Sequence, residues 1–108
     1  RYVKIGKLVY ATCYVLLSAE GTVTGNAQIQ GLPFTAENTA TLYSIAATQW
    51  SGLATNWVSV VARVEPNTTT ANIMGLAAAG TANTTPLTAT DIADTTFFVC
   101  TFQYRATA

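Results

Sequence analysis

Two tryptophans stand at the ends of a short polar stretch and are the side chains best suited to hold a ligand. A flat indole ring stacks on the apolar face of a sugar, while neighbouring amides and hydroxyls satisfy the sugar hydroxyls. The pattern predicts a glycan site on a loop over 49–56, assisted by the loop over 34–40. The alternative is that one or both rings close an end of the core. The predicted ligand-binding residues are Gln49, Trp50, Ser51, Asn56 and Trp57.

The chain offers little for catalysis. It has no histidine, which removes the commonest general base, the commonest zinc ligand and any Ser-His or Cys-His pair. Glu20 and Glu37 stand in separate predicted loops, so their spacing does not establish an acid–base pair. Asp91 and Asp94 could share a cation, but only threonine hydroxyls and backbone carbonyls lie near them in sequence, and a capped helical turn explains them better. We therefore expect no catalytic residues, no metal and no cofactor.

The two cysteines lie in apolar runs near opposite ends of the chain. Cys13 and Cys100 are expected to be buried, reduced thiols, which behave as small hydrophobes. A disulfide between the terminal strands is the alternative, because two cysteines alone define no disulfide framework.

Composition limits the partners. The 108 residues form one domain over 1–108, and five basic and five acidic side chains cancel, leaving no electrostatic footprint for nucleic acid or an anionic membrane. The longest nearly apolar run, 8–17, is too short to span a bilayer, and no signal peptide is visible. Because the chain begins at Arg1 and enters a strand-like run at once, we expect it to be the C-terminal fragment of a longer protein.

Alternation with period two dominates the chain and predicts an all-β, antiparallel, jelly-roll-like β-sandwich. The expected strands are 2–17 (one strand, or two broken at Gly6), 27–31, 41–48, 58–65, 73–79 and 96–105. A single helical turn is expected within 88–96, with Thr90 or Asp91 as its cap. The residues predicted to face inward are Val9, Cys13, Val15, Val58, Val60, Val64, Phe98, Cys100 and Phe102.

One strand face remains without a partner. The small odd-numbered residues of 8–17 supply core, whereas the even-numbered set is too apolar for water. Charged residues make up only 9% of the chain, which favours association over colloidal stability. Burial in a closed trimer would cover the apolar face and would also account for the low share of charged residues. The predicted oligomer interface consists of Leu8, Tyr10, Tyr14 and Leu16.

Three segments carry a resemblance to a known family. They read RYVKIGKLV at 1–9, TGNAQIQGLPF at 24–34 and FFVCTFQYRA at 97–106. Together they resemble the distal domain of bacteriophage tail fibres and tailspikes. The resemblance implies a homotrimeric β-sandwich at a fibre tip on the virion, involved in trimerisation and attachment to the host surface. The matching positions are scaffold residues, with no catalytic or receptor role: Tyr2, Lys4, Ile5, Gly6, Gly31, Leu32, Pro33 and Phe34.

Two other functions stay open. The domain could be a purely structural trimerisation cap, or a carbohydrate-binding module attached to a secreted bacterial enzyme. The predicted partners are therefore the chain itself and a host cell-surface glycan or other receptor, with no nucleic acid and no membrane insertion.

Overall fold

Antiparallel strands make up nearly all regular structure of this computed structural model, which describes residues 1–17, 25–39, 43–80 and 82–107. None of the helical structure in these residues is long and apolar enough to cross a membrane. The strands are β1 (Tyr2–Ile5), β2 (Leu8–Leu16), β3 (Gln28–Gln30), β4 (Ser44–Ser51), β5 (Ser59–Val64), β6 (Thr70–Leu76), β7 (Thr85–Pro86) and β8 (Phe97–Arg105), with one 3₁₀ turn, η1 (Ala89–Asp91). The predicted all-β fold class is confirmed.

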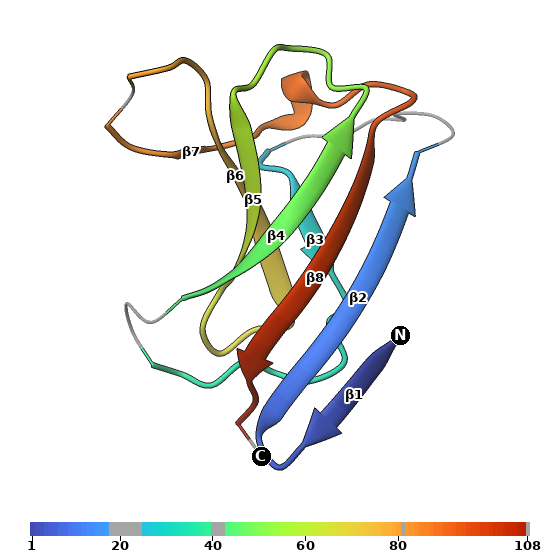
Figure 1. The fold of residues 1–108 in the computed structure, drawn as a ribbon, viewed down its shortest axis with the longest axis vertical. Coiled ribbons are helices and arrows are strands. Elements are labelled where there is room, and N and C mark those ends of the chain that lie inside the picture. Colours follow the sequence, from blue (N-terminus) through green and yellow to red (C-terminus); the bar gives the residue numbers. More distant parts are fainter. Residues whose placement is uncertain (18–24, 40–42, 81, 108) are drawn as a thin grey trace.

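The strands belong to one sheet that curls over its own core. Its order is β1-β2-β8-β4-β5-β6-β3, with β7 paired to β6, and every pairing is antiparallel. Figure 1 shows β3 behind β8 and β4, so the two ends of the sheet face each other across the interior. The two layers of the predicted sandwich are thus the two halves of a single curled sheet.

The long first run of the sequence folds as a hairpin rather than as one strand. Ile5 lies opposite Leu8, so only Gly6 and Lys7 form the turn. Gly6 has a φ of +59°, a left-handed conformation that a two-residue hairpin turn needs and that glycine adopts without strain. The alternative of two strands broken at Gly6 is the correct one.

The core follows the predicted alternation in most places. Six of the residues predicted to face inward are buried: Val9, Val60, Val64, Phe98, Cys100 and Phe102. Cys13 and Val15 are only half-buried, because they line cavities beside the free edge of β2. Val58 was wrongly assigned to the core. It precedes β5 and is 54% exposed, while the neighbouring Trp57 packs against the core instead.

Several element boundaries differ from the sequence prediction. β4 continues to Ser51 because its last residues pair with β8, Trp50 opposite Phe98 and Ser51 opposite Phe97. β6 begins at Thr70, three residues before the predicted strand. The helical turn exists, but its N-cap is Thr88 rather than Thr90 or Asp91. For β4 and β6 the deciding contact is pairing with a strand distant in sequence, whereas the cap is set locally by Thr88 and Asp91.

The two cysteines are direct neighbours across the sheet. Cys13 on β2 lies opposite Cys100 on β8, and both stand as free thiols, Cys100 buried and Cys13 half-buried. The reduced state stays a prediction. Burial raises the pKa of Cys100 to about 11. A buried thiol with a raised pKa holds little reactive thiolate at neutral pH.

We expect the two thiols to react at different rates. In the native protein Cys13, which lines a surface cavity, should be labelled by a thiol reagent well before Cys100, which is 0% exposed. Denaturation without reductant should release both. Measuring labelled sites by intact mass checks this, and recovery of no free thiol after denaturation would show a disulfide instead.

Candidate functional site

Both tryptophans lie at one end of the curled sheet and pack partly against the core. Trp50 stands near the end of β4 and points to the same inward side as Ala46, which is buried. Trp57 lies just ahead of β5. Both rings are half-buried and contact the hydrophobic core cluster. The rings therefore serve at least in part to close this end of the sandwich.

Trp57 is fixed by both its ring and its nitrogen. The indole N–H donates to Thr55 Oγ1 at 2.9 Å and to Asp91 Oδ1 at 3.3 Å. Its ring lies directly over Gly75, where a Cβ atom would stand 2.7 Å from Trp57 Cε3 and 2.7 Å from the carbonyl oxygen of Ser59. Only glycine leaves this space open to the ring.

Asp91 joins the η1 segment to the loop between β4 and β5 at this end. Its carboxylate accepts from the Thr88 backbone N–H at 2.8 Å, from the Thr55 hydroxyl and from the Trp57 indole. Burial alone would raise the pKa of Asp91, but the hydrogen bonds from Thr55, Thr88 and Trp57 outweigh it and hold the pKa below the ordinary value of 3.8. The Thr-x-x-Asp spacing of 88–91 is a capping-box pattern and was the available sequence signal.

The lowered pKa predicts acid-sensitive stability. The folded-state pKa of Asp91 lies below the unfolded-state pKa. The ionised carboxylate therefore contributes its full share of the free energy of unfolding above the unfolded-state pKa, and this share is lost as the pH falls through the folded-state pKa. The stability gap between the wild type and Asp91→Asn should therefore narrow below about pH 4. Urea unfolding at several pH values measures this gap, and a gap that stays constant into acid would contradict the role given to the carboxylate.

The polar partners predicted for a sugar do not gather around the rings. Gln49 and Ser51 are exposed on the outer face of β4, whereas Trp50 points inward, because successive side chains of a strand alternate. Asn56 is exposed beside Trp57. Of the three predicted polar partners, only Asn56 lies next to a ring, because it directly precedes Trp57 in the sequence. Gln49 and Ser51 lie on the opposite side of the sheet from the Trp50 ring.

The second loop expected to assist this site is remote from it. Figure 1 places the segment after β3 at the end of the molecule opposite the loop between β4 and β5. Pairing at that far end includes Ala36 with Ala106, just beyond the last residue of β8. The predicted assistance is therefore wrong, because the length of β4 separates the two loops. Ala40 and Glu20 lie outside the described residues.

The loop after β3 is instead anchored by scaffold contacts. The Tyr104 hydroxyl donates to the Phe34 carbonyl oxygen at 2.8 Å and accepts from the Phe34 N–H at 3.2 Å. Tyr2 packs edge-on against the Phe34 ring with centroids 5.3 Å apart, and Lys4 Nζ lies 5.2 Å from the same ring centre. Glu37 pairs with Arg105 at 3.2 Å. Three positions that match the family resemblance, Tyr2, Lys4 and Phe34, thus lie together at the Phe34 ring.

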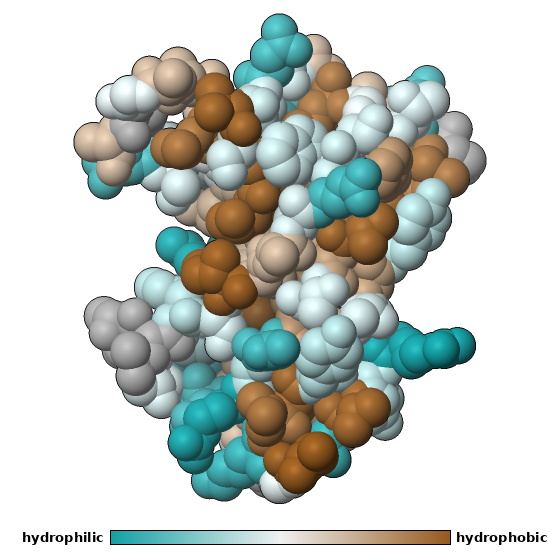
Figure 2. All heavy atoms as spheres, viewed as in Figure 1, coloured by the Kyte–Doolittle hydropathy of each residue, from teal (hydrophilic) through white to brown (hydrophobic). Residues whose placement is uncertain are grey.

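The predicted oligomer interface lies together on the outer side of β2. Its side chains are 53%, 44%, 64% and 56% exposed for Leu8, Tyr10, Tyr14 and Leu16. Tyr14 also stacks on Phe97 of β8, with ring centroids 6.0 Å apart. Figure 2 shows the hydrophobic residues of this side in several groups, separated mostly by residues of intermediate hydropathy. We call these four residues the β2 outer face.

The two candidate surfaces differ in what they can do. At the tryptophan end, the Trp57 indole N–H and the Asp91 carboxylate hydrogen-bond to other groups of the chain, so these two groups are not free to bind a ligand. The β2 outer face carries no charged side chain and is suited to burial against another apolar surface.

Comparison of the chain with protein-family models, with curated proteins and with solved structures gives no match to a known protein.

Proposed function

We propose that this domain is a non-catalytic virion fibre-tip domain that forms the trimer of a phage tail fibre or tailspike and attaches to a host-surface glycan. The observation that carries the proposal is the β2 outer face. Four large side chains that the sequence pattern assigns to an interface are all exposed on one strand. The three segments that resemble phage fibre tips supply the fibre context.

The physical argument for self-association starts from the cost of exposure. Leaving large apolar side chains in water costs about 25 cal/mol for each Å² that burial would remove. A cyclic trimer buries the same patch on every subunit and closes without exposing a new one. With only ten charged side chains in the chain, few charges need to be desolvated when such an interface forms.

Host attachment is the second part of the proposal, and the tryptophan end is its proposed site. The half-buried rings of Trp50 and Trp57 and the exposed Asn56 are the groups that a sugar could meet there. A shallow site of this kind binds at roughly millimolar affinity, about 4 kcal/mol, and three copies raise the avidity if they can engage together.

A second candidate function, the purely structural trimerisation cap, is favoured by one observation. Gln49 and Ser51 point away from Trp50, so the polar groups predicted to bind sugar hydroxyls do not converge. The two candidates share the trimer and differ only in ligand binding.

An array of bacterial surface glycans, both lipopolysaccharide and capsular, tests the attachment. The intact domain, fluorescently labelled, should bind at least one glycan. Asn56→Ala should weaken that binding at unchanged melting temperature, while Gln49→Ala, on the outer face of β4, is the matched control. Absence of binding to every glycan by a trimeric sample would reject attachment in favour of the structural cap.

A further inference from the structure

The curled sheet has an open seam between its two ends. In the described residues β3 pairs only with β6, and no ladder joins β3 to β2. β1 occupies one half of this seam: it pairs with the first half of β2, and Tyr2 reaches Phe34, which follows β3. The other half, beside Tyr14 and Leu16, has no such strand in the described part of the chain.

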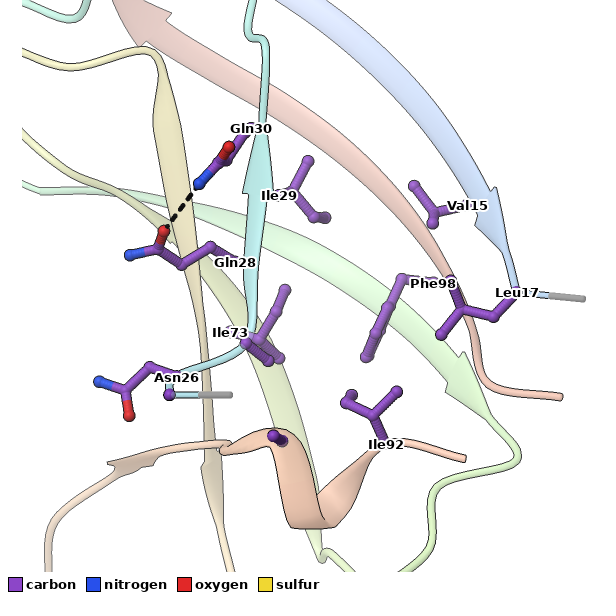
Figure 3. Close-up of a pocket in the computed structure, with 12 residues that line it drawn as sticks. Val15, Leu17, Asn26, Gln28, Ile29, Gln30, Ile73, Ile92 and Phe98 are labelled. Atoms are coloured by element: carbon purple, nitrogen blue, oxygen red, sulfur yellow. Dashed lines mark hydrogen bonds between the residues drawn. The ribbon is translucent and has the colours of Figure 1, made fainter. Parts of the chain in front are cut away.

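An apolar cavity of about 490 Å³ lies along this open half. Its walls come from β2 on one side and β3 on the other, with β6, β8 and the segment around η1 between them. In Figure 3 the glutamines of β3 point away from the cavity, whereas the apolar side chains point into it. Those apolar side chains are Val15, Leu17, Ile29, Ile73, Ile92 and Phe98.

The β2 side of the seam presents backbone groups that have no strand partner in the described part of the chain. In an antiparallel ladder, alternate residues direct their N–H and C=O groups to the same neighbour. Leu17 N–H donates to Thr96 O at 3.0 Å, so the backbone groups of the odd-numbered residues of β2 point to β8. Thr12 N–H donates to Arg1 O at 2.9 Å, so the backbone groups of the even-numbered residues point to β1. Tyr14 and Leu16 are the even-numbered residues of β2 beyond the end of β1.

The β3 side is open in the same way. Ile73 N–H donates to Ala27 O at 3.1 Å. The backbone groups of the odd-numbered residues of β3 and of Ala27 therefore point to β6. The backbone groups of Gln28 and Gln30 therefore face the seam. Within the residues that the structure describes, two rows of backbone groups without a strand partner thus border an apolar cavity, which is the arrangement that recognises an added strand.

We propose that the open half of the seam is an acceptor groove for an extended strand that continues β1, antiparallel to β2. The occupant we assign is the peptide joined to the amino group of Arg1 in the fibre, so the inference rests on the proposed function for the source of that strand. The register of β1 sets the direction. Arg1 already exchanges backbone bonds with Thr12, its N-terminal amine donating to Thr12 O at 3.3 Å.

The same register defines the side chains that the strand must carry. Extending the pairing of Tyr2 with Ala11 places the first added residue opposite Cys13, which lines a neighbouring cavity of about 310 Å³. The third added residue lies opposite Val15, which lines the cavity of the open half. The second and fourth face Tyr14 and Leu16 and exchange backbone bonds with them. The groove therefore selects apolar side chains at the first and third positions and tolerates polar ones between.

A four-residue extension tests the groove directly. We would fuse Thr-Val-Thr-Val ahead of Arg1 and follow amide hydrogen exchange by NMR in the whole domain. The matched control is Thr-Val-Pro-Val, because proline lacks the N–H that would bond to Tyr14. With the first extension, exchange at Tyr14 and Leu16 should slow at least about tenfold, while the already paired amides of Val9 and Phe102 serve as the reference.

Each outcome decides the proposal. Slowed exchange with the valine–threonine extension and not with the proline control supports a strand acceptor. Equal exchange in the extended and unextended proteins would overturn it, and so would slow exchange at both amides in the unextended protein, since the edge would then already be paired. The oligomer mass and glycan binding of the unextended domain test the fibre function separately, so the two proposals can fail independently.

Discussion

Replacing Trp57 with alanine is expected to lower the free energy of unfolding by about 3 kcal/mol, or the melting temperature by roughly 12–24 °C. The change removes a ring that packs on the core and leaves the space over Gly75 empty. It also leaves the carboxylate of Asp91 with one donor fewer. Thermal unfolding followed by circular dichroism measures the loss.

Two further variants separate the causes. Trp57→Phe keeps most of the ring and removes the indole N–H, so it should cost about 1 kcal/mol. Gln49→Ala, on the exposed outer face of β4, should change stability by less than about 0.5 kcal/mol. An unchanged melting temperature for Trp57→Ala would mean that the ring contributes little to the fold and is free for the sugar-stacking role that the sequence suggests.

The second large effect is expected for assembly rather than folding. Tyr14→Asp places a charge on the β2 outer face in place of a ring that is 64% exposed in the single chain. Burying that charge in the proposed trimer should weaken each subunit contact by about 2–4 kcal/mol, which is roughly a 30- to 1000-fold loss of affinity. Sedimentation velocity across a dilution series measures the shift toward monomer.

Thr12→Asp is the matched control for this prediction. It adds the same charge on the same strand, but where a small, already polar side chain stood. It should shift the association equilibrium much less than Tyr14→Asp. Equal effects of the two substitutions would show that added charge, and not loss of the Tyr14 contact, controls association.

The strands of the core were predictable because burial imposes period two on the sequence. In β8 the inward set Phe98, Cys100 and Phe102 alternates with more exposed residues, and that pattern is visible without a structure. The break at Gly6 was visible as an alternative, since glycine suits a two-residue turn. Alternation and turn residues were sufficient to predict the structure wherever it depends on one strand and its two faces.

The candidate site was less predictable, because its geometry depends on distant partners. The polar run from Gln49 to Ser51 has the composition of a loop, yet pairing with β8 extends β4 through it. That pairing sends Trp50 inward and its neighbours outward. Nothing local in the sequence states that Gly75 leaves room for Trp57, since the two residues meet only after β5 pairs with β6.

The open seam was equally hidden. Alternation in 8–17 identifies an inner and an outer face of β2, but it does not say which edge of the strand finds a partner. That depends on the register of β1, which stops at Thr12, and on the position of β3 across the interior. Edge pairing is a property of the assembled sheet and not of any one strand.

The solution mass of the unmodified domain tests the central claim most directly. Light scattering coupled to gel filtration, from about 1 to 100 µM, covers the range in which a specific interface of this kind should hold. The account predicts three times the chain mass of 11.4 kDa. A mass equal to one chain throughout this range would contradict it.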